Sequence, residues 1–149
     1  MEIDDPLRLD RQVCFALAVA NRAVLAVYRP LLEPLGLTHP QYLVMLALWG
    51  DAPMSVKSIA EAVQLDSPTL SPLLKRLETA GLVRRERSAR DERSVEVRVT
   101  EKGLALREQA LQVPRRIVAA TSFDVDEIRV LRARLDELTI ALDAAALEA

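Results

Sequence analysis

Two short helical segments joined by about three residues constrain the fold of this chain more than any other feature. Residues 55–63 carry apolar side chains at helical spacing, and Ser55 can cap their first turn. Residues 67–80 follow with the same periodicity and stop at Gly81. Two short helices with so brief a connection are typical of a helix-turn-helix, and we expect one here.

The second of these helices has two candidate starting points. Ser67 followed by Pro68 gives an N-cap with proline at the first helical position. Pro72 removes a backbone hydrogen bond, so either the first turn is kinked or the regular helix begins at Ser71 as a second cap. The sequence leaves both starts open.

A charged hairpin is predicted directly after this helix pair. Residues 82–87 and 94–100 have β-type composition, and the second segment alternates valines with charged side chains. The hairpin carries six arginines against four acidic residues, so it is basic within a chain of net charge −2. A helix-turn-helix followed by a hairpin predicts a winged helix, in which the second helix enters the major groove of DNA.

The segments that precede the helix pair are predicted to be helical. Residues 7–32 have apolar side chains at helical spacing, and Pro34 and Gly36 end that helix. Thr38 and Gln41 have the spacing of a capping box, and the run that follows to residue 50 is apolar on nearly every side. We therefore expect a long first helix and a deeply buried second one.

Two more helices are predicted after the hairpin. Thr100 caps a helix through Ala120 that is interrupted near Pro114, and Asp124 starts the last helix. Leucine-type residues in the last helix recur at intervals of three and four, which is a heptad seam that requires a partner helix. The seam consists of Ile128, Leu131, Leu135, Leu138 and Leu142.

The predicted fold is mainly α, a winged helix-turn-helix with the order four helices, β-hairpin, two helices. We expect a single domain over residues 1–149. Its DNA-binding region would be residues 38–100, and residues 7–33 and 101–149 would supply dimerisation helices. The protein is thus predicted to be a homodimer.

The candidate DNA contacts lie on the second helix of the pair and on the hairpin. Leu70, Leu73, Leu74 and Leu77 are predicted to face the core. This leaves Ser67, Thr69, Ser71, Lys75 and Arg76 on the helix, and Arg87, Arg90, Asp91 and Arg93 on the hairpin. Arg76 is the predicted base-reading residue, and Asp91 is expected to hold an arginine side chain. The alternative is a hairpin that is only a solvated, ion-paired surface.

Cys14 is the only cysteine, so an internal disulfide is excluded, and one cysteine with one histidine predicts no structural metal site. A lone cysteine on an apolar stripe is either a small core residue or a reactive thiol. The Tyr28 hydroxyl could donate a hydrogen bond to the thiolate, but about 21 Å of helix separates Tyr28 from Cys14. Contact would require antiparallel first helices of two subunits.

His39 is either an exposed first-turn residue or a group that tunes the thiolate.

Other functional classes lack support in the sequence. The N-terminus has no apolar segment of a signal peptide, and no run of about eighteen apolar residues occurs, so we expect a cytoplasmic protein without a membrane span. No glycine-rich phosphate loop or paired catalytic carboxylates stand out, which predicts no enzyme and no cofactor.

Four segments carry a resemblance to a known family. Residues 12–17 (QVCFAL), 37–43 (LTHPQYL), 65–77 (LDSPTLSPLLKRL) and 87–93 (RSARDER) resemble the MarR family of regulators and its OhrR subgroup. The resemblance implies a repressor bound to pseudo-palindromic double-stranded operator DNA. An organic hydroperoxide would oxidise the reactive cysteine to a sulfenate, which becomes a mixed disulfide with a small thiol or an overoxidised acid, and the operator is released.

The resemblance assigns roles to particular residues. Cys14 matches the reactive cysteine, Tyr28 a tyrosine that hydrogen-bonds to it across the dimer, and Asp91 with Arg93 the wing-tip pair. Ala18 and His39 depart from the subgroup, which usually has tyrosines at both positions. The alternative within the family is a regulator that responds to a small aromatic ligand, with Cys14 as a structural residue.

Overall fold

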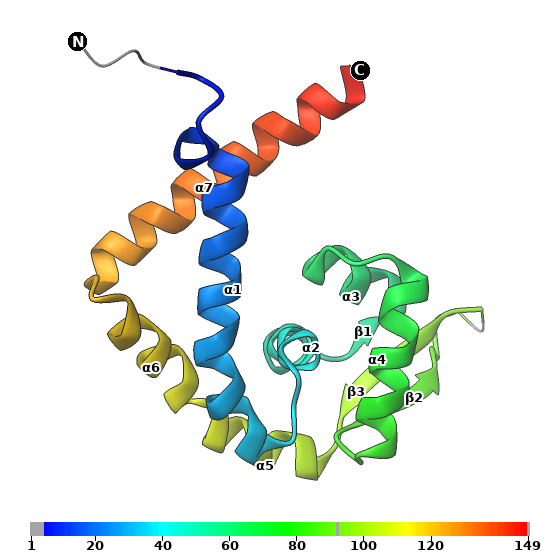
Figure 1. Ribbon diagram of the computed structural model, residues 1–149. Coiled ribbons are helices and arrows are strands. Elements are labelled where there is room, and N and C mark those ends of the chain that lie inside the picture. Colours follow the sequence, from blue (N-terminus) through cyan, green and yellow to red (C-terminus); the bar gives the residue numbers. More distant parts are fainter. Residues whose placement is uncertain (1–4, 92, 149) are drawn as a thin grey trace. The chain divides into compact units, whose positions relative to one another are not determined.

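The computed structural model describes residues 5–91 and 93–148, and it divides the chain into two compact units, residues 1–113 and 114–149 (Figure 1). The first unit holds helices α1 to α5 and a small sheet, and the second holds most of α6 and all of α7. Glu92, which the predicted charge balance of the hairpin includes, lies outside the described residues.

The first helix begins later than predicted. A short 3-10 helix, η1, covers Leu9–Arg11, and α1 covers Val13–Leu32. Gln12 between them has an extended backbone, with φ −85° and ψ 119°, and its side-chain amide donates to the carbonyls of Pro6 and Arg8 at 2.8 Å. The expected start of the helix at Leu7 was therefore wrong, because these hydrogen bonds close a separate turn.

The end of α1 was predicted correctly. A second 3-10 helix, η2 (Glu33–Leu35), follows Leu32, and Gly36 reverses the chain with φ 68°. Glycine accepts this left-handed conformation without steric cost. Leu32 and Leu35 are buried here, which fixes the C-terminal end of α1 in the core of the first unit.

Helix α2 (His39–Asp51) has the predicted capping box. The Gln41 side chain accepts from the backbone N–H of Thr38 at 2.9 Å, and the Thr38 hydroxyl accepts from that of Gln41 at 3.4 Å. Val44, Met45 and Leu48 are at most 1% exposed. Leu46 is 42% exposed, so α2 is buried on one side and not all around as its apolar sequence suggested.

Helices α3 (Val56–Val63) and α4 (Ser67–Thr79) form the predicted pair. Ser55 caps α3, as expected, but the cap of α4 is Asp66, whose carboxylate accepts from the Thr69 backbone N–H at 2.8 Å. Ser67 is thus the first helical residue and not the cap. The helix runs through Pro72 without a second start at Ser71.

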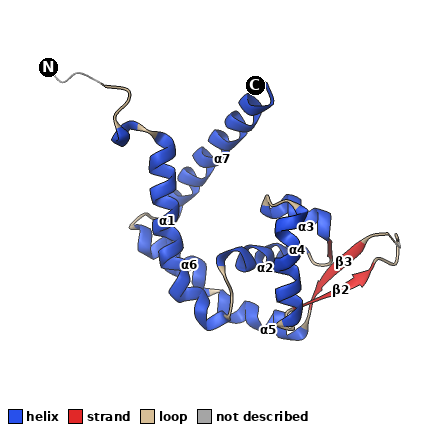
Figure 2. Ribbon diagram, turned by 45° about the vertical axis from the view of Figure 1, so that its right-hand side comes forward, coloured by secondary structure: helices blue, strands red, loops and turns tan. Residues whose placement is uncertain are grey.

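The sheet has three antiparallel strands in the order β1-β3-β2. The predicted hairpin is β2 (Val83–Arg87) with β3 (Val95–Val99), and it extends away from the helices (Figure 2). The third strand, β1 (Met54–Ser55), was read as loop and cap, and it pairs Met54 with Val97. Val83 and Val97 are buried, so one face of the hairpin is apolar, as predicted.

Helix α5 (Glu101–Ala110) packs against the turn between α4 and β2. The Thr100 hydroxyl caps α5 by accepting from the Gly103 backbone N–H at 3.1 Å. The helical run breaks at Leu111, and α6 (Gln112–Thr121) follows. Pro114 explains the break, because it cannot donate to the carbonyl of Ala110 and its ring crowds that carbonyl.

The second unit contains the last helix, α7 (Val125–Glu148). Asp124 and Glu127 cap it reciprocally, since each carboxylate accepts from the other residue's backbone N–H. No described residue of α7 is buried. Leu131, Leu135 and Leu142 of the predicted heptad seam are 44%, 39% and 57% exposed. The seam therefore lies open in the single chain.

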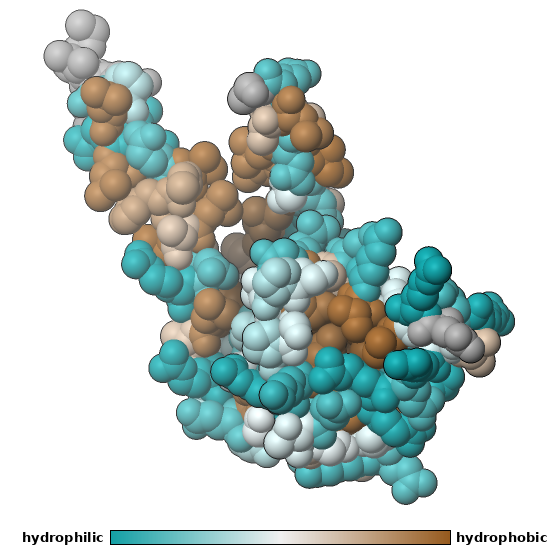
Figure 3. Space-filling model, turned by 90° about the vertical axis from the view of Figure 1, so that its right-hand side faces the viewer, coloured by the Kyte–Doolittle hydropathy of each residue, from teal (hydrophilic) through white to brown (hydrophobic). Residues whose placement is uncertain are grey.

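Helix α1 also has an exposed apolar surface. By length and composition, Val13–Leu35 could cross a membrane, with a mean hydropathy of 1.3, which the sequence reading did not anticipate because charged residues interrupt the run. Figure 3 shows apolar side chains gathered on the arm that carries the N-terminus. The large ones are Val13, Phe15, Leu17, Val19, Val24 and Val27.

We predict that Gly103→Ala destabilises the fold. A Cβ at this position would lie 2.3 Å from the Leu82 carbonyl oxygen and 2.7 Å from Val99 Cγ1. The backbone would have to shift, at a cost of about 1–3 kcal/mol in the free energy of unfolding. Urea unfolding followed by circular dichroism, at one fixed protein concentration, measures this change.

Gly50→Ala is the matched control. Gly50 lies near the C-terminal end of α2, and nothing lies within 4 Å of the Cβ it would gain. The same substitution should leave stability unchanged or raise it by up to about 1 kcal/mol. Equal effects at the two glycines would contradict the close packing at Gly103.

Candidate nucleic-acid interface and cysteine site

Helix α4 buries one face and exposes the other. Leu70, Leu73, Leu74 and Leu77 are all at most 9% exposed, as the periodicity predicted. The predicted contact residues on the opposite side are all exposed: Ser67, Thr69, Ser71, Lys75 and Arg76. The helix is therefore anchored by its leucines and presents a polar surface to solvent.

The exposed residues of α4 lie in two rows. Ser67, Ser71 and Lys75 are four residues apart and line one edge of the exposed face. Thr69 and Arg76 are seven residues apart and line the other edge. The predicted residues thus form two tracks along the helix rather than one cluster.

Asp66 is a feature of this surface that sequence analysis missed. Its hydrogen bonds from Thr69 hold the pKa of the carboxyl below its usual range, so it is ionised at neutral pH. A carboxylate at a helix N-terminus satisfies free N–H groups and also repels a phosphate. DNA contacts at this end would therefore come from the neighbouring hydroxyls rather than from the helix terminus itself.

The arginines of the hairpin fall into two groups. Arg84 Nε lies 2.6 Å from Glu86 Oε1, and Arg98 Nε lies 3.1 Å from Glu86 Oε2. Arg85 pairs with Glu78 of α4 at 3.2 Å. In contrast, no side-chain ion pair forms at Arg87, Arg90 or Arg93 among the residues that the structure describes. The unpaired arginines are the three proposed from the sequence.

The tip of the hairpin is shaped by backbone hydrogen bonds. Asp91 Oδ1 accepts from the backbone N–H of Arg93 at 3.0 Å, and the Asp91 carbonyl accepts from that of Ser94 at 3.0 Å. The Ser88 hydroxyl accepts from the Arg90 backbone N–H at 3.2 Å. Among the described residues the Asp91 side chain contacts the backbone of Arg93, and its expected contact with an arginine side chain stays a prediction. Asp91 orders the turn that carries Arg93.

Cys14 and Tyr28 do not meet within the chain. Cys14 is the second residue of α1 and is exposed, and exposed Ala18 follows one turn later. Tyr28 lies towards the other end of the same helix, where its ring centroid is 4.7 Å from that of His39. The structure therefore brings Tyr28 and His39 together and leaves Cys14 and Ala18 apart from them.

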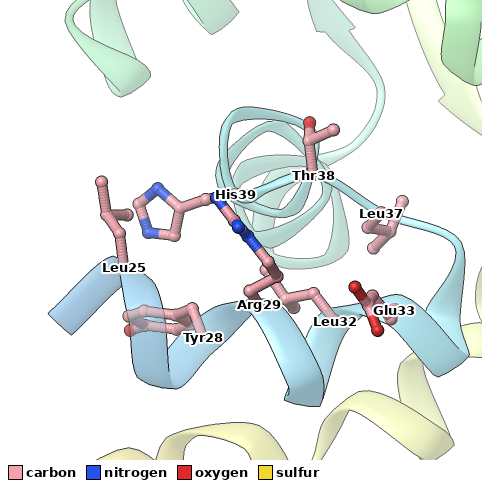
Figure 4. Close-up of a pocket in the computed structure, with 8 residues that line it drawn as sticks. All are labelled: Leu25, Tyr28, Arg29, Leu32, Glu33, Leu37, Thr38 and His39. Atoms are coloured by element: carbon pink, nitrogen blue, oxygen red, sulfur yellow. The ribbon is translucent and has the colours of Figure 1, made fainter. Parts of the chain in front are cut away.

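A cavity of about 390 Å³ lies between α1 and α2 (Figure 4). It is lined by Leu25, Tyr28, Arg29, Leu32, Glu33, Leu37, Thr38 and His39. Burial raises the pKa of Tyr28 and lowers that of His39, so the imidazole is neutral at pH 7. Tyr42 extends the aromatic group, with its ring centroid 5.9 Å from that of Tyr28. The small-ligand alternative expects a cleft between the dimerisation and DNA-binding regions, but the sequence did not name its walls, because they come from two helices whose packing no local pattern reveals.

Residues 37–95 match the profile of the MarR family. The organic hydroperoxide resistance transcriptional regulator of Bacillus subtilis is 40% identical over 131 residues, which cover 88% of this chain and 89% of the relative. The HTH-type transcriptional regulator TtmR of Methylorubrum extorquens is 45% identical over 143 residues, covering 96% and 73%.

Solved structures show a similar fold. AbfR of Staphylococcus epidermidis bound to DNA, in a reduced and in an overoxidised form, is 34% identical with a TM-score of 0.74. The match covers 91% of this chain and 95% of the reduced AbfR chain. The shared fold and this level of identity extend over almost the whole chain.

We predict that the pKa of His39 lies below its ordinary value of about 6.5. His39 is the only histidine in the sequence, so an NMR titration of the imidazole resonances reads it directly. Because the unfolded chain binds a proton more readily, stability should fall as pH drops below about 6.5. His39→Gln should remove that part of the pH dependence.

Tyr28→Ala tests the cause of this shift. The substitution removes the ring that covers His39, so the histidine pKa should return towards about 6.5. A wild-type pKa at or above that value would contradict the burial of the imidazole.

Proposed function

Because the chain belongs to the MarR family, whose characterised relatives are transcription regulators and not enzymes, we propose that it binds operator DNA as a homodimer and represses transcription. The observation that carries the proposal is the pairing of an exposed polar face on α4 with Arg87, Arg90 and Arg93 of the hairpin, which form no ion pair among the described residues. Such a regulator acts in the cytoplasm, without a cofactor or a metal.

The two surfaces suit different parts of a DNA duplex. Helix α4 would enter the major groove, where Lys75 and Arg76 can reach base edges and the serine and threonine hydroxyls can contact phosphates. The hairpin would follow the backbone to the minor groove, where the negative potential attracts Arg90 and Arg93. A dimer would read two half-sites about 10 base pairs apart.

A second copy of the chain is the proposed occupant of the apolar surfaces. The open heptad seam of α7 has the spacing of a helix that packs on another helix. The exposed apolar side chains of α1 would be buried in the same dimer. We favour a second copy over a membrane for α1, because Arg22 and Arg29 lie within the helix and its C-terminal end is already packed in the core.

The proposed signal is an organic hydroperoxide that reacts at Cys14. The thiolate sulfur attacks the outer oxygen of the hydroperoxide, the O–O bond breaks, and the alkoxide leaves and takes up a proton to become an alcohol. The sulfur is thereby oxidised to a sulfenic acid. A low-molecular-weight thiol then attacks that sulfur, and water leaves as the mixed disulfide forms. This sequence needs no second cysteine.

The dimer would complete the environment of Cys14. If α1 runs antiparallel to its copy, the Tyr28 and His39 pair of one subunit lies near Cys14 of the other, and the Tyr28 hydroxyl can stabilise the thiolate. The similarity to the hydroperoxide resistance regulator of Bacillus subtilis supports this assignment. Overoxidised AbfR has been solved bound to DNA, which favours the bulkier mixed disulfide as the releasing form here.

The cavity between α1 and α2 favours a second candidate signal. Its volume of about 390 Å³ and its apolar and aromatic walls suit a small aromatic ligand, with Arg29 available to a carboxylate. In that case Cys14 would be a structural residue.

The DNA proposal predicts that Arg93→Ala weakens operator binding by about ten- to a hundredfold. Binding is measured by fluorescence anisotropy with a duplex that the wild-type protein selects from a random-sequence library. Arg84→Ala is the control, because it removes the same charge from the hairpin but takes an arginine already paired with Glu86. Equal losses in the two variants would show that only net charge matters.

The signal proposal predicts that cumene hydroperoxide with a small thiol releases bound DNA from wild-type protein and not from Cys14→Ser. Mass spectrometry of the wild-type protein should show one thiol adduct per chain. Tyr28→Phe should still respond, but more slowly, because the thiolate loses its hydroxyl donor. Release from Cys14→Ser would contradict the thiol mechanism and direct attention to ligands such as benzoate.

A further inference from the structure

Glu78, near the C-terminal end of α4, holds Arg85 of β2 through three contacts. Glu78 Oε2 accepts from the Arg85 backbone N–H at 3.3 Å and from Nε at 3.4 Å. Glu78 Oε1 accepts from Nη2 at 3.2 Å. The side-chain contacts form a fork-to-fork pair, which fixes direction better than a single contact does.

This ion pair differs from the others in the hairpin. Glu86 binds Arg84 and Arg98, so those contacts join residues within the hairpin itself. Only the Glu78 pair, among the ion pairs of the described hairpin residues, reaches α4. Arg85 stands opposite Val97, on the face of the sheet that is packed against the helices, and its side chain is only 32% exposed.

The base of the hairpin is held at a separate point. The Thr100 hydroxyl donates to the Gly81 carbonyl at 2.6 Å, and Lys102 Nζ donates to the Ala80 carbonyl at 2.8 Å. These contacts fix the turn that leaves α4. Further along the hairpin, β3 is paired with β1 at Val97 and Glu96. Arg85, the middle residue of β2, ties the other strand to α4 at the same height.

An acidic residue on the helix that faces DNA requires an explanation. Glu78 would repel phosphates if it had no partner. The hydrogen bonds from Arg85 place a positive charge beside it and hold the pKa of its carboxyl below the usual range. It is therefore an ionised partner of Arg85 at neutral pH, and the charge of Arg85 balances its own.

We propose that Glu78 is a positioning residue for DNA binding: by holding Arg85, it fixes the angle between α4 and the hairpin. Arg93 then reaches the backbone while α4 occupies the major groove. This inference rests on the proposed function, and it concerns how two contacts are made at once. Loss of Glu78 leaves both contact surfaces intact but uncouples them.

The test is a double-mutant cycle on DNA affinity, with the duplex selected by wild-type protein. Arg93→Ala should weaken binding at least about tenfold in the wild-type background. In the Glu78→Gln background it should weaken binding by no more than about threefold, because the hairpin no longer delivers Arg93. A purely structural role would lower the unfolding midpoint and leave the tenfold effect of Arg93 unchanged.

Two further backgrounds separate geometry from charge. Glu86→Gln makes the same chemical change on the outer face of β2, and there Arg93→Ala should keep its effect of about tenfold. Arg85→Gln breaks the same link with the opposite change of charge, and it should reduce the effect as Glu78→Gln does. It also carries the test if Glu78→Gln does not fold.

The outcomes are distinguishable. A tenfold effect of Arg93→Ala that persists in Glu78→Gln and Arg85→Gln overturns the inference and leaves the proposed function standing. No effect of Arg93→Ala in the wild-type background overturns the proposed role of the hairpin, and this inference with it. Failure of both link variants to fold would show that the pair serves stability instead, and would also overturn the inference.

Discussion

The close approach of two backbones at Gly103 is the contact on which the arrangement of the first unit depends. Because Gly103 has no side chain, the first turn of α5 lies directly against the Leu82 carbonyl, where α4 passes into β2. The Gly103 carbonyl accepts from Trp49 Nε1 at 2.9 Å, which ties α2 to the same point. One small residue thus joins α2, the hairpin and α5, and the surface that faces DNA keeps its shape because its supports converge there.

Much of the local structure could be predicted, because the signals that start and stop helices lie within a few residues of one another. Thr38, Ser55, Thr100 and Asp124 were recognised as caps from their own neighbourhood. The cap of α4 was misplaced by one residue, because Asp66 and Ser67 are both good caps and only the backbone geometry separates them.

The features that escaped prediction depend on residues far apart in the sequence. Strand β1 exists because Met54 meets Val97, and no property of a two-residue segment announces such a pairing. The division of the arginines into paired and unpaired ones likewise follows from the strand register, which sets Glu86 beside Arg98. The proposed environment of Cys14 also escaped a local pattern, since Tyr28 lies towards the other end of α1 and His39 begins α2.

The neutralised arginines of the hairpin bear on how the protein would find its target. Non-specific affinity for DNA grows with the number of phosphates that a protein neutralises, and here Arg84, Arg85 and Arg98 are already occupied by acidic partners. These three arginines therefore add little to non-specific affinity, and the contribution of the hairpin falls to Arg87, Arg90 and Arg93. Affinity for DNA would then depend more on contacts specific to the operator than on the total charge of the hairpin.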